Sequence, residues 1–181
     1  MSLLKDFKPA LLFLGKFLVI YLAGNILYGL YVESYEQAPD GLTRIVTGQT
    51  SELLNRAGYD SSYEDVPAVA KVAMKEAGDV VLYVFEGCNG LNVAIVFVAF
   101  LFAYGGPIKW FAIFLPVGLL LIHLFNLLRI GLLYHLALNN STQFYYYHKY
   151  FFTATLYFVV FAIWYLWVVK LNENRNVKAE A

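Results

Sequence analysis

Three residues of this sequence could together carry out nucleophilic acyl transfer: the single cysteine, Cys88, with Arg129 and His148. A thiolate attacks a carbonyl carbon, an imidazole can move the proton, and a guanidinium stabilises negative charge without titrating usefully. An ordinary thiol, with a pKa of about 8.5, is mostly protonated at neutral pH. Because Cys88 opens an apolar segment, we expect a helix N-terminus to lower its pKa, and a nearby guanidinium or imidazolium to lower it further.

Polar side chains next to these residues could support the same chemistry. Glu86 and Asn89 flank the cysteine in the sequence Glu-Gly-Cys-Asn-Gly. If the segment around Arg129 is helical, Asn126 lies about 60° from Arg129 and about 60° from His123, at about 100° per residue. A polar stripe therefore follows this segment. We include Glu86, Asn89 and Asn126 as supporting candidates.

The composition places these residues in a membrane protein. Of the 181 residues, 60% are hydrophobic and 14% are charged, and the mean hydropathy is +0.59. Soluble domains are about half apolar and about a quarter charged. The balance of 13 basic and 13 acidic residues argues against a nucleic-acid binder, and one cysteine excludes a disulfide scaffold. We therefore expect an integral protein of the lipid bilayer, and neither a soluble enzyme nor a disordered chain.

Four segments are candidate transmembrane helices, because a bilayer core of about 30 Å requires roughly 20 apolar residues per helix. They lie at about 9–32, 88–104, 110–134 and 149–169, and the second is short. We predict a single membrane domain over 1–181. It is an all-α integral membrane bundle of about four transmembrane helices, with a short extracytoplasmic insertion at 33–87 and a cytoplasmic tail at 170–181.

Basic residues in the short flanks predict the orientation. They precede the first span, separate the second from the third and follow the fourth: Lys5, Lys8, Lys109, Lys170, Arg175 and Lys178. With four spans these flanks share one side, so we expect a multi-pass protein of the cytoplasmic (inner) membrane with both termini in the cytoplasm. The first span is too long for a signal peptide, which favours an uncleaved anchor. Residues 33–86 carry ten acidic and four basic residues, in agreement with an outer location.

The insertion itself has local order. Five residues recur at helical spacing and predict a short amphipathic helix on the membrane surface or against the bundle: Leu42, Ile45, Val46, Gln49 and Leu53. Further on, residues 69–75 alternate, the run 80–85 is β-branched and aromatic, and Ala77-Gly78-Asp79 is a turn signal. We therefore expect a helix followed by a β-hairpin that leads into the second span.

The predicted topology brings the three reactive residues to one depth. Cys88 opens the second span on its outer side, and His148 immediately precedes the fourth. Arg129 follows Trp110 by nineteen residues, about 28 Å along a helix, so it also lies near the outer, periplasmic surface. Polar groups inside spans are costly and usually functional. We therefore predict that a thiol, a guanidinium and an imidazole converge at that face.

These residues resemble a known family. Three features resemble the exosortase/archaeosortase family and are most similar to its compact exosortase F branch. They are Glu-Gly-Cys-Asn-Gly around Cys88, Asn-Leu-Leu-Arg-Ile, which contains Arg129, and His148 before a final aromatic span. The resemblance implies a membrane-embedded cysteine protease or transpeptidase with a Cys88–Arg129–His148 triad and no cofactor. It also implies a membrane-anchored protein substrate, whose C-terminal sorting signal combines a short motif, a transmembrane helix and a basic tail.

Each of these residues also has an ordinary structural interpretation. A lone cysteine in a membrane protein is usually a small inert hydrophobe. Arg129 could extend to the lipid headgroups or pair with Glu86, and His148 could belong to an interfacial belt with the neighbouring tyrosines. For His123 a hydrogen bond to Asn126 or to a backbone carbonyl is the favoured interpretation. Metal binding is disfavoured, because the sequence has no cluster with ligand spacing.

Two other functions stay open at this point. The protein could be a non-catalytic scaffold or assembly protein that binds a partner through its acidic outer segment. It could also be a small transporter in which His123, Asn126 and Arg129 line a polar path. The second alternative is disfavoured, because the chain shows no pair of broken spans, the usual sequence sign of a transport site.

Overall fold

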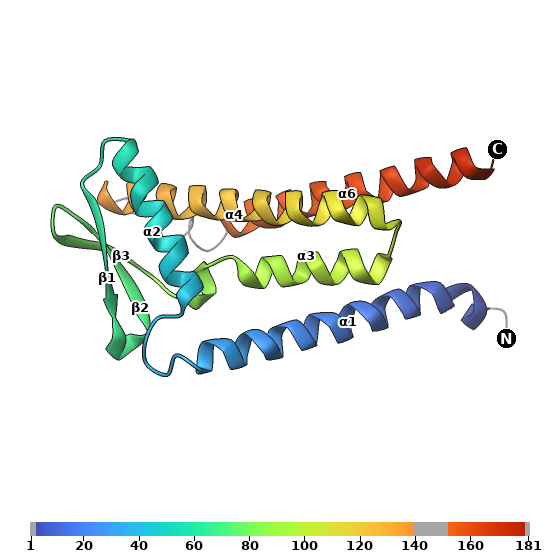
Figure 1. Ribbon diagram of the computed structural model, residues 1–181, viewed down its shortest axis with the longest axis horizontal. Helices are drawn as coiled ribbons and strands as arrows, with labels where there is room; N and C mark the ends of the chain where they lie inside the picture. Colours follow the sequence, from blue (N-terminus) through green and yellow to red (C-terminus); the bar gives the residue numbers. More distant parts are fainter. Residues whose placement is uncertain (1–2, 140–151, 180–181) are drawn as a thin grey trace.

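The computed structural model describes residues 3–139 and 152–179. Four helices run alongside one another: α1 (Leu3–Glu33), α3 (Leu91–Tyr104), α4 (Ile108–Leu138) and α6 (Phe152–Ala179). The start of α1, the end of α6 and the turn between α3 and α4 lie at one end of the bundle (Figure 1). A further helix, α2 (Gly41–Arg56), and a small β-sheet cover the other end. This end carries Cys88, just before the start of α3.

Apolar sequence accounts for the long helices. Among the described residues, α1 from Phe7 to Glu33 and all of α4 are long and apolar enough to cross a bilayer. Helix α3 and the apolar part of α6, Ala154–Lys170, are shorter. At about 1.5 Å per residue, the 14 residues of α3 extend only about 21 Å. The predicted second span began too early, because residues 86–88 form a separate 3₁₀ turn, η2 (Glu86–Cys88).

The predicted amphipathic helix is present as α2, although only Val46 of its five pattern residues is buried. Asp40 caps the helix by accepting hydrogen bonds from the backbone N–H groups of Leu42 and Thr43, both at 3.0 Å. Ile45 and Leu53 are 54% and 47% exposed. The buried face is instead mostly hydroxylic: Thr43, Val46, Thr47, Thr50, Ser51 and Leu54.

Local hydrogen bonds explain why threonines occupy the inner face of α2. The hydroxyls of Thr47 and Thr50 donate to the backbone carbonyls of Thr43 and Val46, at 2.7 and 2.8 Å. Each hydroxyl is thereby satisfied within the helix, so its burial leaves no polar group unpaired. Small side chains then let α2 pack closely on α4, where Thr50 reaches the surface of Gly131.

The β-structure is a three-stranded antiparallel sheet in the order β1-β2-β3, formed by β1 (Ser61–Val66), β2 (Lys71–Glu76) and β3 (Asp79–Val84). The predicted hairpin is confirmed as β2–β3. Its two-residue turn, Ala77-Gly78, has positive φ at both positions, as a tight hairpin requires. The expectation of a hairpin alone, in an otherwise all-α chain, was wrong. β1 was missed because its sequence, Ser-Ser-Tyr-Glu-Asp-Val, is polar and mostly exposed.

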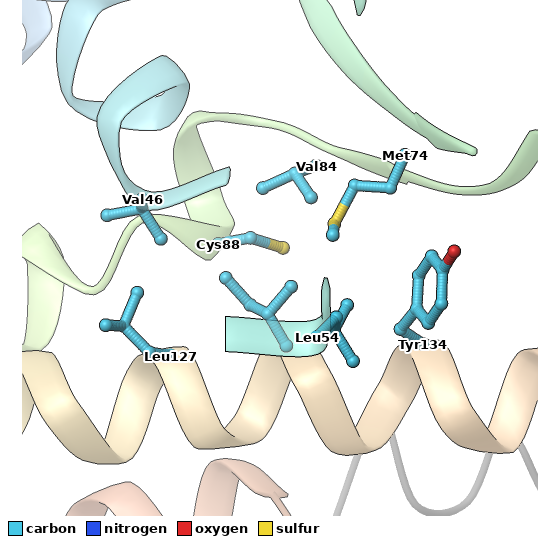
Figure 2. Packing of buried hydrophobic residues seen from close by; sticks show 8 residues of the cluster. Val46, Leu54, Met74, Val84, Cys88, Leu127 and Tyr134 are labelled. Carbon is cyan, nitrogen blue, oxygen red and sulfur yellow. The ribbon is translucent and has the colours of Figure 1, made fainter. Parts of the chain in front are cut away.

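Two buried clusters hold the described residues together. One lies inside the bundle and joins α3, α4 and α6: Phe97, Leu101, Ile122, Val160, Ile163 and Trp167. The other lies beneath the sheet and α2 and contains Cys88 (Figure 2). Large apolar side chains elsewhere on α1 and α4 point outward, including Leu11, Val19, Ile26, Leu120 and Leu128, each more than half exposed. Such surfaces suit lipid better than water.

Candidate functional site

Cys88 is the last residue of η2, in the connection between β3 and α3. Its backbone N–H donates to the carbonyl of Phe85 at 2.7 Å, which closes the turn. The residue is 6% exposed. Figure 2 shows Sγ pointing into an apolar cluster formed by α2, β2, β3 and α4, whose other members are Val46, Leu54, Met74, Val84, Leu127, Ile130 and Tyr134. A reagent or substrate therefore reaches the sulfur only if part of this cluster moves.

Arg129 of α4 is the charged neighbour of the thiol. Burial raises the pKa of the Cys88 thiol, while the charge of Arg129 and a hydrogen bond from its side chain act in the opposite direction. The expected lowering by a helix N-terminus was wrong, because the N-cap of α3 is Gly90, two residues further on. Desolvation of the thiolate dominates here, and the guanidinium only partly offsets it.

Asn126 joins the cysteine and the arginine. It is fully buried, and its Nδ2 donates to the backbone carbonyl of Cys88 at 2.9 Å. Its Oδ1 lies 3.4 Å from Nη1 of Arg129, which donates to it. Gly90 permits this arrangement, because its φ is +84° and a Cβ there would lie 3.1 Å from Cγ of Asn126. One amide therefore orients both the loop that carries the thiol and the guanidinium.

Asn89 also has a structural environment of its own. Its Nδ2 donates to the hydroxyl of Tyr28 at 2.8 Å and to that of Thr43 at 3.3 Å. Its Oδ1 accepts from the backbone N–H of Leu91 at 2.9 Å, at the start of α3. The carbonyl of Glu86 accepts from the Tyr28 hydroxyl at 2.8 Å. Within the cysteine motif, both flanking candidates are thus tied to the loop's conformation.

Arg129 has no carboxylate partner among the described residues. The ion pairs there join Arg44 to Asp65, Arg56 to Glu52 and Lys75 to Glu64. The predicted alternative, a pair between Arg129 and Glu86, is therefore not formed. Nε of Arg129 is buried and has no hydrogen-bond partner in the described part of the chain. The side chain retains a donor that could bind an anionic group.

Of the two histidines considered in the sequence, only His123 lies in the described part of the chain. His148 lies outside the described residues. His123 hydrogen-bonds through Nε2 to Oε1 of Gln49 on α2 at 2.8 Å, and not to Asn126 or to a carbonyl as expected. The two residues line a shallow groove of about 290 Å³ between α2 and α4, which Leu127 separates from Cys88. Over the residues that the structure describes, no three His, Cys, Asp or Glu side chains are grouped so as to hold a metal ion.

Two residues in contact with this site were not among the sequence candidates. Tyr28 lies in an apolar helix that contains other tyrosines, so the composition of the helix suggests a packing role for it and no hydrogen bond to the cysteine loop. Thr43 belongs to the buried hydroxylic face of α2, which the pattern of apolar residues did not include. The sequence sign for these two partners was Asn89, because an amide that becomes buried in a glycine-flanked turn needs hydrogen-bond acceptors from elsewhere in the fold.

The sequence model described as transmembrane exosortase (Exosortase_EpsH) matches residues 3–167. No curated protein and no solved structure matches. The matched range includes α1, the sheet, the cysteine loop and both long apolar helices, and it reaches into α6. That coverage extends well beyond half of the 181 residues, and we conclude that this membrane protein belongs to the transmembrane exosortase family.

Proposed function

We propose that the protein is a membrane-embedded cysteine protease or transpeptidase that cleaves C-terminal sorting signals of exported, membrane-anchored proteins. The observation that carries this proposal is the Arg129 guanidinium beside the Cys88 loop, where Asn126 donates to the Cys88 carbonyl and accepts from Nη1 of Arg129. An inert cysteine needs no cation beside it. Arg129 is half-buried, its Nε is buried without a partner, and it has no carboxylate partner among the described residues. Such a charge is costly unless it has a use.

In the proposed reaction His148 takes the proton of the Cys88 thiol, and the resulting thiolate attacks the carbonyl carbon of the scissile peptide bond. Arg129 stabilises the negative charge, either on the thiolate or on the oxyanion that develops from the carbonyl oxygen. The C–N bond then breaks, the amine leaves with a proton from His148, and the acyl group remains on sulfur as a thioester. Water or an amine attacks the thioester and gives its proton to His148. The C–S bond then breaks, the acyl group leaves on the water oxygen or the amine, and His148 returns the proton to sulfur, which regenerates the thiol.

Burial of the sulfur implies that the substrate opens the site. In its closed form the thiol is protonated, because burial raises its pKa, and seven side chains of the cluster surround it. A substrate segment that displaces part of α2 or of the β2–β3 hairpin would expose Sγ while Arg129 stays in contact. The closed cluster would also protect the thiol from indiscriminate alkylation or oxidation.

The substrate's membrane anchor fits this location. The site lies at the end of the bundle opposite the start of α1 and the end of α6 (Figure 1). The basic flanks of the sequence favour a cytoplasmic location for those two ends. The site would then face the periplasm, at the outer surface of the cytoplasmic membrane. Lateral arrival of a transmembrane helix would turn a bimolecular encounter into an oriented one.

The test compares cells that carry the wild-type protein or Cys88→Ala. Membrane-anchored exported proteins are digested, and their C-terminal peptides are identified by mass spectrometry. We expect sorting helices to be removed in the wild type and to persist in Cys88→Ala and in Arg129→Gln. Normal removal in Cys88→Ala would contradict the proposal. It would favour the scaffold function if charge reversal of the acidic residues between 40 and 65 abolished processing.

A further inference from the structure

The loop that presents Cys88 has little structure of its own. It consists of a three-residue 3₁₀ turn, closed by the Cys88 N–H to Phe85 bond and a longer one, 3.4 Å, from Asn89 to Glu86. Glycines occupy positions 87 and 90. Glycine loses more conformational freedom on folding than other residues, so such a loop needs contacts from elsewhere to keep one conformation.

Tyr28 of α1 supplies the first of these contacts. Its side chain is 9% exposed, and its hydroxyl accepts from Nδ2 of Asn89 at 2.8 Å. The same hydroxyl donates to the carbonyl of Glu86 at 2.8 Å. Residues 86 and 89 lie on either side of Cys88. One oxygen atom on a neighbouring helix therefore joins the two ends of the turn that holds the thiol.

Thr43 of α2 supplies the second contact. Its Oγ1 accepts from Nδ2 of Asn89 at 3.3 Å and donates to Oδ2 of Asp40 at 2.5 Å. Thr43 and Asp40 are 1% and 3% exposed, and Asp40 is also the cap of α2. The Asp40 carboxylate fixes the orientation of the hydroxyl, because it can only accept. The lone pairs of Thr43 therefore face the Asn89 amide.

Together these bonds satisfy the whole side chain of Asn89. Its amide nitrogen donates to hydroxyls from α1 and α2, and its oxygen accepts from Leu91. The hydroxyls of Tyr28 and Thr43 bind the loop at Asn89 and at the Glu86 carbonyl, on either side of Cys88. Their effect on Cys88 acts through the backbone of the loop. The geometry therefore resembles that of a clamp, which we define as Tyr28, Thr43 and Asp40.

We propose that Tyr28 and Thr43, with Asp40 behind Thr43, are positioning residues that keep the Cys88 loop closed and its thiol beside Arg129. This inference rests on the proposed function only for its catalytic consequence. The loop's closure itself can be measured without a substrate. Loss of the Tyr28 hydroxyl removes its bonds to Asn89 and to the Glu86 carbonyl, and loss of the Thr43 hydroxyl removes its bond to Asn89. Either change leaves a buried amide hydrogen unpaired. The loop should then open more often, which exposes Sγ and displaces it from the guanidinium.

The test uses iodoacetamide, a small neutral reagent, on the purified full-length protein in detergent. Cys88 is the only cysteine, so each adduct seen by intact-mass spectrometry is assigned to it without ambiguity. We expect Thr43→Val to be alkylated about fivefold faster than the wild type, the factor that corresponds to one net hydrogen bond to the loop. Tyr28→Phe removes two such bonds and should be accelerated at least as much. Thr43→Ser retains the hydroxyl and should react like the wild type.

Two controls separate positioning from general loosening. Tyr31→Phe removes a hydroxyl one turn further along α1, which contacts Tyr35 and the Leu42 backbone but not the loop. Val160→Ala destabilises the cluster inside the bundle, away from Cys88. We expect a lower Tm for Val160→Ala and wild-type alkylation for both controls. Unchanged alkylation in Tyr28→Phe, or equal acceleration in Val160→Ala, would overturn the proposal.

Processing of sorting signals provides the second measurement. If the clamp positions the thiol, Tyr28→Phe and Thr43→Val should process more slowly than Tyr31→Phe at equal protein levels, and Thr43→Ser should restore the rate. Normal processing by both clamp variants, where Cys88→Ala is inactive, would refute positioning and leave the proposed function intact. Normal processing by Cys88→Ala would refute the proposed function, and the alkylation rates would still decide whether the clamp closes the loop.

Discussion

Gly90 provides the sharpest test of the contact between the cysteine loop and α4. Its φ of +84° is unfavourable for any residue with a Cβ, and alanine there costs about 1–2 kcal/mol of stability. A Cβ would also lie 3.1 Å from Cγ and 3.2 Å from Nδ2 of Asn126. Asn126 must shift, and its bond to the Cys88 carbonyl weakens, which adds about 1 kcal/mol or more. We expect Gly90→Ala to reduce the free energy of unfolding by about 2–4 kcal/mol.

Gly58 offers a matched control. Its φ is +96°, and a Cβ there would have no atom within 4 Å, so Gly58→Ala introduces the same backbone strain without the contact. The free energy of unfolding is measured by denaturant titration in detergent micelles, and the rate of Cys88 alkylation is measured alongside. We expect Gly90→Ala to be the less stable variant by about 1 kcal/mol and to be the only one with altered alkylation. Equal stability losses and equal alkylation rates would show that Asn126 does not depend on Gly90.

Three further predictions concern the charge, the proton and the bundle. Arg129→Met should slow alkylation of Cys88 at pH 8 by about tenfold or more, because the charge of Arg129 lowers the pKa of the thiol. Arg44→Met removes an ion pair with Asp65 and should leave the alkylation rate unchanged. Equal alkylation rates in the two variants would contradict the role of Arg129. Burial raises the pKa of the Cys88 thiol in the folded protein above its value in the unfolded chain, about 8.5. The folded protein therefore keeps this proton to a higher pH than the unfolded chain does. The free energy of unfolding should be unaffected by this group below the unfolded-chain pKa and fall as the pH rises through it, and Cys88→Ala should abolish this part of the fall. Gly118→Ala would put a Cβ 2.2 Å from the ring of Phe97, so we expect it to cost about 1–3 kcal/mol, measured by Tm, without changing alkylation; an unchanged Tm would show that α3 and α4 can separate freely.

The long apolar segments were predictable because lipid imposes a simple requirement on sequence. A run of apolar residues of sufficient length gives α1 and α4 directly. The β2–β3 hairpin was equally visible, since Ala77-Gly78 is a turn between two alternating or β-branched runs. β1 was not, because an exposed edge strand of polar residues lacks the hydrophobic pattern on which strand prediction depends.

Tertiary packing decided the features that the sequence left open. The buried hydroxylic face of α2 could not be anticipated from hydropathy, because Thr47 and Thr50 satisfy their hydroxyls on their own helix. The shift in the pKa of Cys88 was misjudged because the surrounding cluster comes from four elements distant in sequence. Asn126 and Arg129 were placed near Cys88 by depth and helical spacing, and the structure brings these three residues together. The position of His148 stays a prediction.

The central claim, that Cys88 is the attacking nucleophile, is tested most directly by trapping the acyl-enzyme. Membranes that contain the protein and its anchored substrates are quenched in acid, and the chain is analysed by intact-mass and peptide mass spectrometry. The mechanism predicts an acyl adduct on Cys88 that hydroxylamine removes, as expected of a thioester, and that Arg129→Gln reduces. Rapid substrate processing without any adduct on Cys88, or undiminished processing by Cys88→Ala, would contradict it.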